Sequence, residues 1–273
     1  MNYILASREA ICDMIEIHGR VYPWDGMILA SSCDKSVPAQ LKAAARLDIP
    51  AIFIPGGSMR NGPEMTTSLK AGDISLRQKR EGAITEQEIR DYKLTGCPSV
   101  GPVPFLERPA PCSAWRGVGT GSAWSGLIPA TMRDILSWAR RAGRIIMKLA
   151  REDIRPGRIM TDKAFENAMM VHSAIGGSTN GVIHLTSIAR ELGIELLPEM
   201  FDEINHKVPH IGNIAPGGSH LTEAFWFAGG VPMVELALKD MLNLDVMTVT
   251  GKTLGENLDD LQRDGFLTDI PDI

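Results

Sequence analysis

The sequence predicts an α/β fold in which helices flank a parallel β-sheet, and three observations predict it. Residues 26–30 and 51–54 are short apolar runs, as expected for buried strands. Between them, residues 37–47 carry Leu41, Ala44 and Ala45 at helical spacing, and Pro50 closes that segment. A strand, helix and strand in this order form a βαβ unit, whose two strands run parallel.

Helical patterns account for most of the remaining chain. Ser7 is expected to cap a first helix whose apolar stripe includes Leu5, Ile11 and Met14. Thr85 and Glu88 form a capping box that predicts a helix ending near Gly96. Apolar periodicity predicts further helices at residues 131–150, 161–174, 179–192, 219–227 and 233–242, and a short strand at residues 194–197. The acidic tail from residue 259 shows no recognisable closing element.

Composition restricts the class of protein. The 273-residue chain is 44% hydrophobic and 22% charged, as expected for a globular protein with a sizeable core. A net charge of −5 argues against nucleic acid as a partner, since a basic surface would be needed. The sequence contains neither a membrane-length apolar run nor a signal-peptide pattern, so the expected location is cytoplasmic. Four scattered cysteines do not suggest a disulfide framework, and some of these thiols are candidate metal ligands.

The strongest chemical motif is Cys33-Asp34-Lys35, which directly follows the first predicted strand. Ligands of open parallel sheets collect beyond the carboxyl ends of the strands. A soft thiolate beside a hard carboxylate and an amine can serve a soft metal centre and a hard cation together. Spacing alone favours the alternative, a structural cysteine next to a solvated ion pair, because one thiol specifies no metal.

A second motif places glycines before a predicted helix, in the string Gly176-Gly177-Ser178-Thr179-Asn180. Free amides at a helix start attract anions, which makes Gly177, Ser178, Thr179 and Asn180 candidate substrate-binding or anion-binding residues. An ordinary Ser or Thr cap explains the same pattern equally well. Residues 56–58 and 216–219 are weaker candidates of the same kind.

Several strings together resemble the dihydroxy-acid and sugar-acid (aldonate, phosphogluconate) dehydratase family, in family order over nearly the whole chain. They are Ser7-Arg8-Glu9, Cys33-Asp34-Lys35-Ser36-Val37-Pro38, Cys97-Pro98-Ser99, Leu127-Ile128-Pro129-Ala130-Thr131-Met132, Gly176-Gly177-Ser178-Thr179-Asn180, Phe201-Asp202-Glu203-Ile204 and Val249-Thr250-Gly251-Lys252-Thr253-Leu254.

The resemblance implies a set of cofactors and a reaction. Cys33 would ligate an iron–sulfur cluster (2Fe–2S or 4Fe–4S), with Cys97 as a possible second cysteine near the cluster. Asp34 would bind Mg²⁺, and Lys35 would bind the same ion through a carbamate. The implied hydro-lyase removes water from an aldonate or another 2,3-dihydroxy carboxylic acid to give a 2-keto acid. Family members are homodimers or tetramers that act on a small-molecule hydroxy acid, with no nucleic acid or membrane partner.

The chain also departs from the family pattern. The resemblance assigns residues 1–242 to an incomplete N-terminal α/β domain and residues 243–273 to the start of a linker, and the family's swivelling β-barrel domain, with its base serine, is expected to be absent. No catalytic residue is therefore assigned within this chain. A family segment that precedes the match, with another cluster cysteine and a magnesium-binding aspartate, is also expected to be absent. Val103 stands where the family has a further cluster cysteine.

Residues 102–126 are rich in proline and glycine and follow neither a strand nor a helix period, which is unusual within a domain. The family string Thr-Ala-Ser-Thr-Met-Gln-Cys-Met, read one base late, can give residues 108–115 as they stand. We therefore hypothesise an out-of-frame translation restored near Leu127, which would make Cys112 accidental.

Three functions stay open at this point. The chain is a dehydratase by descent, a non-catalytic piece of one (a pseudogene product or one half of a split gene), or an unrelated anion-binding α/β module. The family strings favour the first two, and the reduced set of ligands predicts no turnover by the chain alone.

The frame hypothesis predicts that resequencing the DNA over codons 100–127 will show a small insertion or deletion relative to the genes of relatives. An unambiguous in-frame read, with no such difference from relatives, would contradict it.

Overall fold

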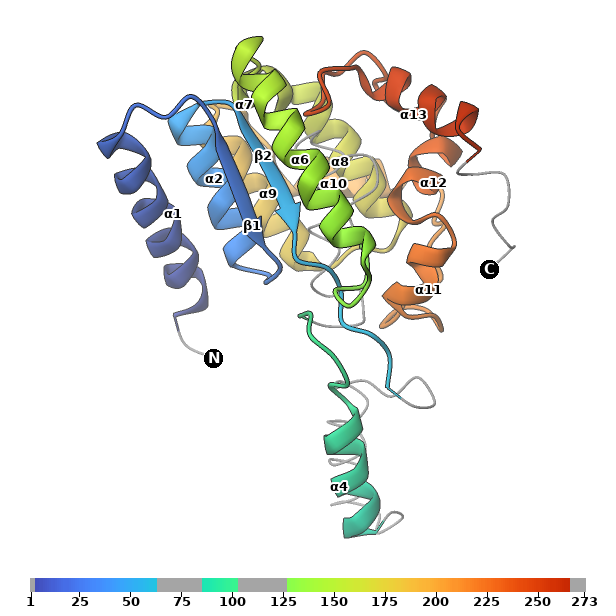
Figure 1. Cartoon of the computed structure of the whole chain (residues 1–273). Coiled ribbons are helices and arrows are strands. Elements are labelled where there is room, and N and C mark those ends of the chain that lie inside the picture. The colour runs from blue at the N-terminus through green and yellow to red at the C-terminus, as the bar shows by residue number, and fades with distance from the viewer. Residues whose placement is uncertain (1–2, 63–84, 103–126, 266–273) are drawn as a thin grey trace.

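The computed structural model describes residues 3–62, 85–102 and 127–265, and within them the predicted α/β architecture is confirmed. Strands β1 (Met27–Ser31) and β2 (Ala51–Pro55) pair in parallel, with Met27 opposite Ala51 and Ser31 opposite Pro55. Helix α2 (Ser36–Leu47) connects them (Figure 1). The crossover unit therefore lies where the apolar runs predicted it.

The other helices, in chain order, are α1 (Ile4–Val21), α4 (Glu86–Thr95), α6 (Asp134–Arg151), α7 (Pro156–Ile159), α8 (Asp162–Ala174), α9 (Thr179–Glu191), α10 (Pro198–Asn205), α11 (Thr222–Phe227), α12 (Gly230–Ala237) and α13 (Leu254–Arg263). Helix α2 packs between α1 and α9, whereas α6 packs against the strands (Figure 1). None of the helices in the described residues has the length and apolar character needed to cross a membrane.

Alternate residues of β2 face the two sides of the sheet, because side chains of a strand alternate in direction. Ala51 and Phe53 are buried in the main core, which includes Leu41 of α2. Ile52 belongs to a second buried cluster with Ala142, Ile146 and Leu149 of α6, and Ile54 packs against that cluster. Helices thus cover both faces of β2, as its apolar run predicted. The first strand differs from the prediction of a buried strand, because Ile28 and Ala30 of β1 are exposed on the α6 side of the sheet.

Four other features of the local prediction were also wrong. Helix α1 begins at Ile4 and not at Ser7, whose hydroxyl donates within the helix to the Ile4 carbonyl. Residues 194–197 form no strand, and α10 follows them with Pro198 in its first turn. The helix expected at residues 233–242 is α12, which begins and ends earlier. Helix α13 was not predicted; it begins at Leu254, before the expected tail, extends into that tail as far as Arg263, and has a capping box formed by Thr253 and Glu256.

Helix α13 is part of the main core through Leu254, Leu258 and Leu261. Residues expected to start a linker therefore pack against the body of the domain. The assignment of residues 1–242 and 243–273 to a domain and a linker stays a prediction. The aberrant segment, residues 102–126, lies outside the described residues except for Pro102, and so do Val103 and Cys112.

Beyond β2, the chain runs beside the segment that precedes α6. Ser58 forms a parallel bridge with Pro129, and its hydroxyl donates to the Leu127 carbonyl at 3.2 Å. Gly57 has a φ of 91°, and a Cβ there would come within 2.6 Å of the Ile128 carbonyl oxygen. The close approach of the two backbone segments therefore requires glycine at this position. This packing explains the glycine of the weaker candidate at residues 56–58 without a bound anion.

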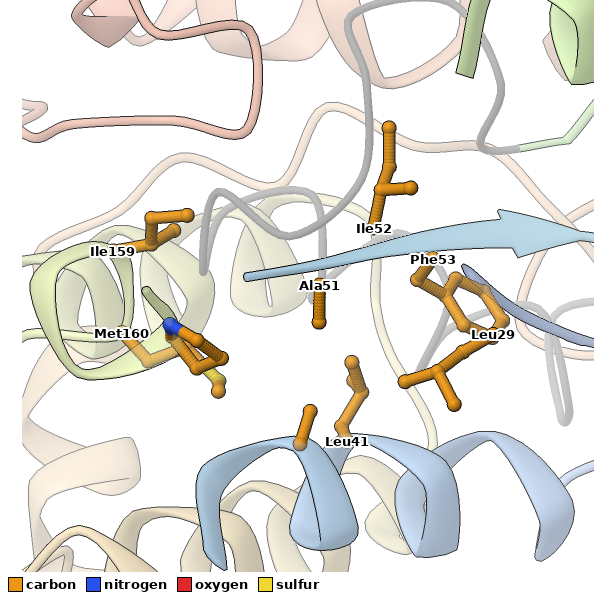
Figure 2. Close-up of a pocket in the computed structure, with 9 residues that line it drawn as sticks. Leu29, Leu41, Ala51, Ile52, Phe53, Ile159 and Met160 are labelled. Carbon is orange, nitrogen blue, oxygen red and sulfur yellow. The ribbon is translucent and has the colours of Figure 1, made fainter. Parts of the chain in front are cut away.

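A small apolar cavity lies between β1, β2, α2 and α7, as the side chains in Figure 2 show. Leu41, Phe53 and Met160 are among the residues that line it, and each is almost fully buried. Since the cavity already leaves part of Leu41 without contacts, further truncation there should be poorly compensated by neighbouring side chains.

We predict that Leu41→Ala lowers the free energy of unfolding by about 2–5 kcal/mol, because it removes buried methyl groups and enlarges this cavity. Leu136→Ala is the matched control, since Leu136 lies on α6 and is 59% exposed; its effect should stay within about 0.5 kcal/mol. Urea unfolding of both variants measures the difference, and equal effects would contradict the assignment of Leu41 to the core.

Candidate functional site

The predicted Cys33-Asp34-Lys35 motif occupies the loop between the carboxyl end of β1 and the start of α2. The Cys33 carbonyl accepts hydrogen bonds from the Val37 amide at 3.1 Å and from the Ser36 hydroxyl at 3.1 Å. These bonds fold the loop into the first turn of α2. The motif therefore lies at a strand end, as its position in the sequence predicted.

The three motif side chains differ in exposure. Cys33 is a free and exposed thiol, whereas Asp34 is buried, with only 9% of its surface accessible. The Lys35 ammonium donates to Asp34 Oδ2. Asp34 Oδ1 is buried and makes no hydrogen bond of normal geometry. A buried carboxylate oxygen without a partner is uncommon in proteins and marks a place where a cation or water can bind.

His184 completes this group from α9, and local sequence patterns did not identify it. Its imidazole is fully buried, and Nε2 lies 3.2 Å from Lys35 Nζ and 3.5 Å from Asp34 Oδ1. On the other side of the ring, Nδ1 lies 3.0 Å from Arg8 Nη1 of α1. The one available signal was a polar residue on the buried face of α9, together with Gly181, Leu185 and Ile188.

The electrostatics of the group favour a charged carboxylate and a neutral imidazole. Burial acts to raise the pKa of Asp34, but His184 and Lys35 outweigh it and lower this pKa below its ordinary value. Burial also lowers the pKa of His184, which keeps the ring neutral near pH 7. The loop thus presents one carboxylate oxygen, available as an acceptor, beside an amine.

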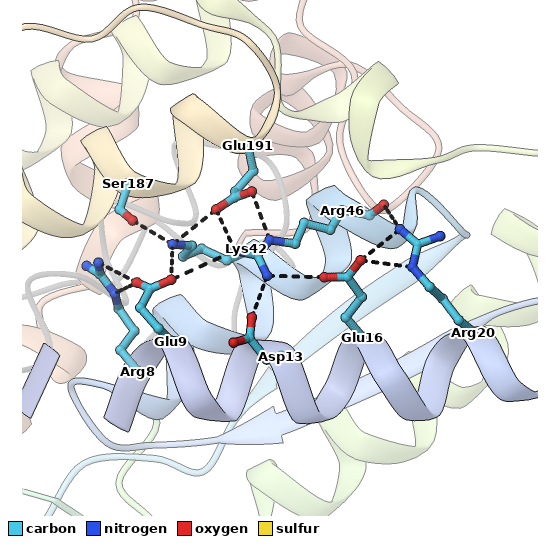
Figure 3. A network of polar contacts seen from close by, with 9 residues as sticks. All are labelled: Arg8, Glu9, Asp13, Glu16, Arg20, Lys42, Arg46, Ser187 and Glu191. Atoms are coloured by element: carbon cyan, nitrogen blue, oxygen red, sulfur yellow. Dashed lines mark hydrogen bonds and ion pairs between the residues drawn. The ribbon is translucent and has the colours of Figure 1, made fainter. Parts of the chain in front are cut away.

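A network of ion pairs continues from Arg8 across α1, α2 and α9, as Figure 3 shows. The Arg8 guanidinium pairs with Glu9, which also accepts from Lys42 at 2.6 Å. Lys42 is 4% exposed and also contacts Ser187 and Glu191 of α9, at 3.0 and 3.1 Å. The three helices that surround the motif loop are therefore connected by charged groups as well as by apolar packing.

The predicted anion-binding residues lie at the start of the helix that carries His184. Ser178 is the N-cap of α9, and its hydroxyl accepts from the Asn180 amide at 3.2 Å. A Cβ at Gly177 would come within 2.2 Å of the buried His172 ring. Capping and ring packing thus give Gly177 and Ser178 structural roles, and anion binding by Gly177, Ser178, Thr179 and Asn180 stays a prediction.

Cys97 follows α4 as a free, exposed thiol, and its segment runs beside the loop after β2. The Ser99 hydroxyl there accepts from the Arg60 amide at 2.9 Å.

Within residues 3–62, 85–102 and 127–265, no group of three or more His, Cys, Asp or Glu side chains is placed to hold a metal ion. The buried free oxygen of Asp34 suits a hard cation and the exposed thiol of Cys33 suits a cluster, so each fits its implied group as one of several ligands.

Comparison with known families assigns the chain to a protein family. Residues 1–257 match the model described as "Dihydroxy-acid/6-phosphogluconate dehydratase N-terminal". The chain belongs to this dehydratase family. The match runs through both the Cys33 loop and the start of α9, so the resemblance inferred from the motifs is confirmed.

Curated relatives support the assignment over the same region. The dihydroxy-acid dehydratase of Acetivibrio thermocellus is 38% identical over 265 residues, which cover 95% of this chain and 48% of the relative. The dihydroxy-acid dehydratase of Halothermothrix orenii is 40% identical over 264 residues, or 94% of this chain and 48% of the relative. The chain thus spans about half the length of the curated relatives that it matches.

The buried His172 should make the stability of the native state depend on pH. Burial lowers its pKa to about 4, and its Nδ1 has no hydrogen-bond partner. Since an unfolded histidine titrates near 6.5, the unfolded chain takes up this proton first as the pH falls. As the pH falls from 6.5 to 4, the free energy of unfolding should therefore decrease by on the order of 3 kcal/mol because of His172.

We predict that His172→Gln flattens the dependence of unfolding free energy on pH in this window, as measured by urea unfolding at several pH values. His206→Gln is the matched control, because His206 is exposed on the surface, and it should keep the wild-type profile. A wild-type slope in the His172 variant would contradict the assignment.

Proposed function

We propose that the chain supplies part of the active site of a dehydratase that converts a 2,3-dihydroxy carboxylic acid into a 2-keto acid. The unpartnered, buried Oδ1 of Asp34, beside Lys35 and one residue after the exposed Cys33, is the observation that carries the proposal. Family membership supports the reaction class, and the relatives' name, dihydroxy-acid dehydratase, supports this substrate class. An aldonate, also expected from the sequence, is the second substrate to assay.

In this proposal, Asp34 and Lys35 hold Mg²⁺, with Lys35 acting through the carbamate that the family resemblance implies, and Cys33 holds an iron–sulfur cluster. When bound, the ion and the cluster supply Lewis-acid chemistry at the hydroxyl groups of the substrate. Residues of this chain would orient the metal ligands. His184 and Lys35 contact the Asp34 carboxylate, and Arg8 contacts the opposite ring nitrogen of His184, Nδ1. Cytoplasmic location and assembly as a homodimer or tetramer belong to the same proposal.

The proposal includes a limit on the isolated chain. The described residues supply one buried carboxylate, one neighbouring amine and one exposed thiol at the motif loop, which is fewer ligands than a closed metal site contains. We therefore propose that this chain binds Mg²⁺ weakly and does not turn over substrate without further ligands. A non-catalytic piece of a dehydratase is the alternative that this limit favours.

We predict that Asp34→Asn weakens Mg²⁺ binding at least about ten-fold, because a neutral amide replaces the one buried carboxylate available to the ion. A Mg²⁺ titration of ¹⁵N-labelled chain, followed by the amide signals of residues 33–37, measures the affinity. Asp245→Asn is the matched control, since its side chain is 68% exposed on the surface. Equal affinity of the wild type and Asp34→Asn would contradict the proposal.

Turnover is assayed with the same chain after reconstitution with iron, sulfide and Mg²⁺. Formation of 2-keto acid is followed with a 2,3-dihydroxy acid and with several aldonates. We expect none from the chain alone, and clear turnover of either substrate class would refute the proposed limit.

A further inference from the structure

The contact between Arg8 and His184 determines where the imidazole carries its proton. Arg8 Nη1 lies 3.0 Å from His184 Nδ1, with Arg8 8% exposed and His184 fully buried. A guanidinium has five N–H donors and no acceptor, so His184 Nδ1 must be the acceptor of this bond. A neutral imidazole whose Nδ1 accepts carries its proton on Nε2.

The position of Arg8 is itself fixed. Glu9 Oε1 lies 2.8 Å from Arg8 Nε and 2.6 Å from its Nη2, so the carboxylate holds one edge of the guanidinium. Glu9 Oε2 is held in turn by the buried Lys42, at 2.6 Å (Figure 3). The remaining Nη1 is the atom that points to His184, and rotating it away would leave a buried Nδ1 without a partner.

The Nε2–H of His184 then faces the motif loop. Its neighbours are Lys35 Nζ at 3.2 Å and Asp34 Oδ1 at 3.5 Å. A lysine ammonium is a donor only, so it cannot accept from Nε2–H. Of the two neighbours, only Asp34 Oδ1 can therefore attract Nε2–H; at 3.5 Å the contact is longer than an ordinary hydrogen bond, so this oxygen stays available to a cation.

We infer that His184, held by Arg8 as the Nε2–H tautomer, is a positioning residue that orients the Asp34 carboxylate. Lys35 holds Oδ2 and His184 faces Oδ1, so the carboxylate is constrained from two sides. The consequence for metal binding rests on the proposed function, whereas the tautomer itself does not. A purely structural histidine, like His172 in its apolar surroundings, has no such charged partners on both ring nitrogens.

The tautomer is tested first, on the full chain with ¹⁵N-labelled histidine and no added metal. Long-range ¹H–¹⁵N correlation spectra distinguish a protonated ring nitrogen from an unprotonated one, and the signals of His184 are assigned by their loss in His184→Gln. We expect Nε2 protonated and Nδ1 unprotonated in the wild type. Protonation of Nδ1 would overturn the inference.

Arg8→Met removes the donor that fixes the ring and is expected to populate the Nδ1–H tautomer. Arg20→Met is the matched control, because Arg20 lies on the same helix and its side chain is 61% exposed; it should keep the wild-type spectrum. If Arg8→Met does not fold, the tautomer of His184 in the wild-type chain alone tests the inference, and protonation of Nδ1 would overturn it. A folded Arg8→Met with an unchanged tautomer would contradict the role of Arg8.

Mg²⁺ binding tests the consequence for Asp34. We expect His184→Leu to weaken Mg²⁺ binding about 10–100-fold, the usual effect of removing a group that orients a metal ligand. His184→Gln keeps an amide donor and should retain more of the affinity than His184→Leu. An unchanged affinity in His184→Leu would overturn the positioning role. If the wild-type chain binds no Mg²⁺, the proposed function fails, and the tautomer alone then decides this inference.

Discussion

Burial of the Asp34 carboxylate is the constraint on which the arrangement of the amino-terminal helices depends. A charged group removed from water costs several kcal/mol unless other charges or hydrogen bonds compensate it. Here the compensation comes from Lys35 in the same loop and from His184 on α9. Because these groups belong to separate segments, the carboxylate keeps its place only while α9 is packed on α2.

From His184 outward, positively and negatively charged side chains alternate along a chain of contacts. Arg8 contacts His184, Glu9 contacts Arg8, and Lys42 contacts Glu9. Exposed pairs at the far end of the network, such as Arg20 with Glu16, contribute little to stability. Lys42 is different, because it is buried, and in the described part of the chain only Glu9 and Glu191 together compensate its charge; the loss of both would cost about 3–5 kcal/mol. The inner part of the network thus couples the packing of α1 to the geometry of the motif loop.

Local sequence information was sufficient for the elements whose causes are local. The strand runs, Pro50 and the Thr85–Glu88 capping box each predicted an element that the structure contains. The position of the motif loop followed from the βαβ order alone. Helix α13 has a signal that is just as local, a capping box of the same type at Thr253 and Glu256, and it was nevertheless not predicted.

Features that depend on distant residues could not be predicted in this way. Arg8 and His184 are 176 positions apart, and neither carries a motif that names the other. His184 belongs to no metal-binding spacing in the sequence, so neither its burial nor its contact with Lys35 could be predicted from local patterns. Likewise, the close approach of the His172 ring to Gly177 could not be predicted from the sequence, and anion binding at this glycine stays a prediction.

A crystal structure of the chain soaked with Mn²⁺, in place of Mg²⁺, would show whether the buried Asp34 carboxylate binds a divalent cation. We expect an anomalous scattering peak within coordination distance of Asp34 Oδ1, with His184 and Lys35 on either side of the carboxylate. An Asp34 side chain turned to solvent and away from His184, or manganese bound only at other carboxylates, would contradict it.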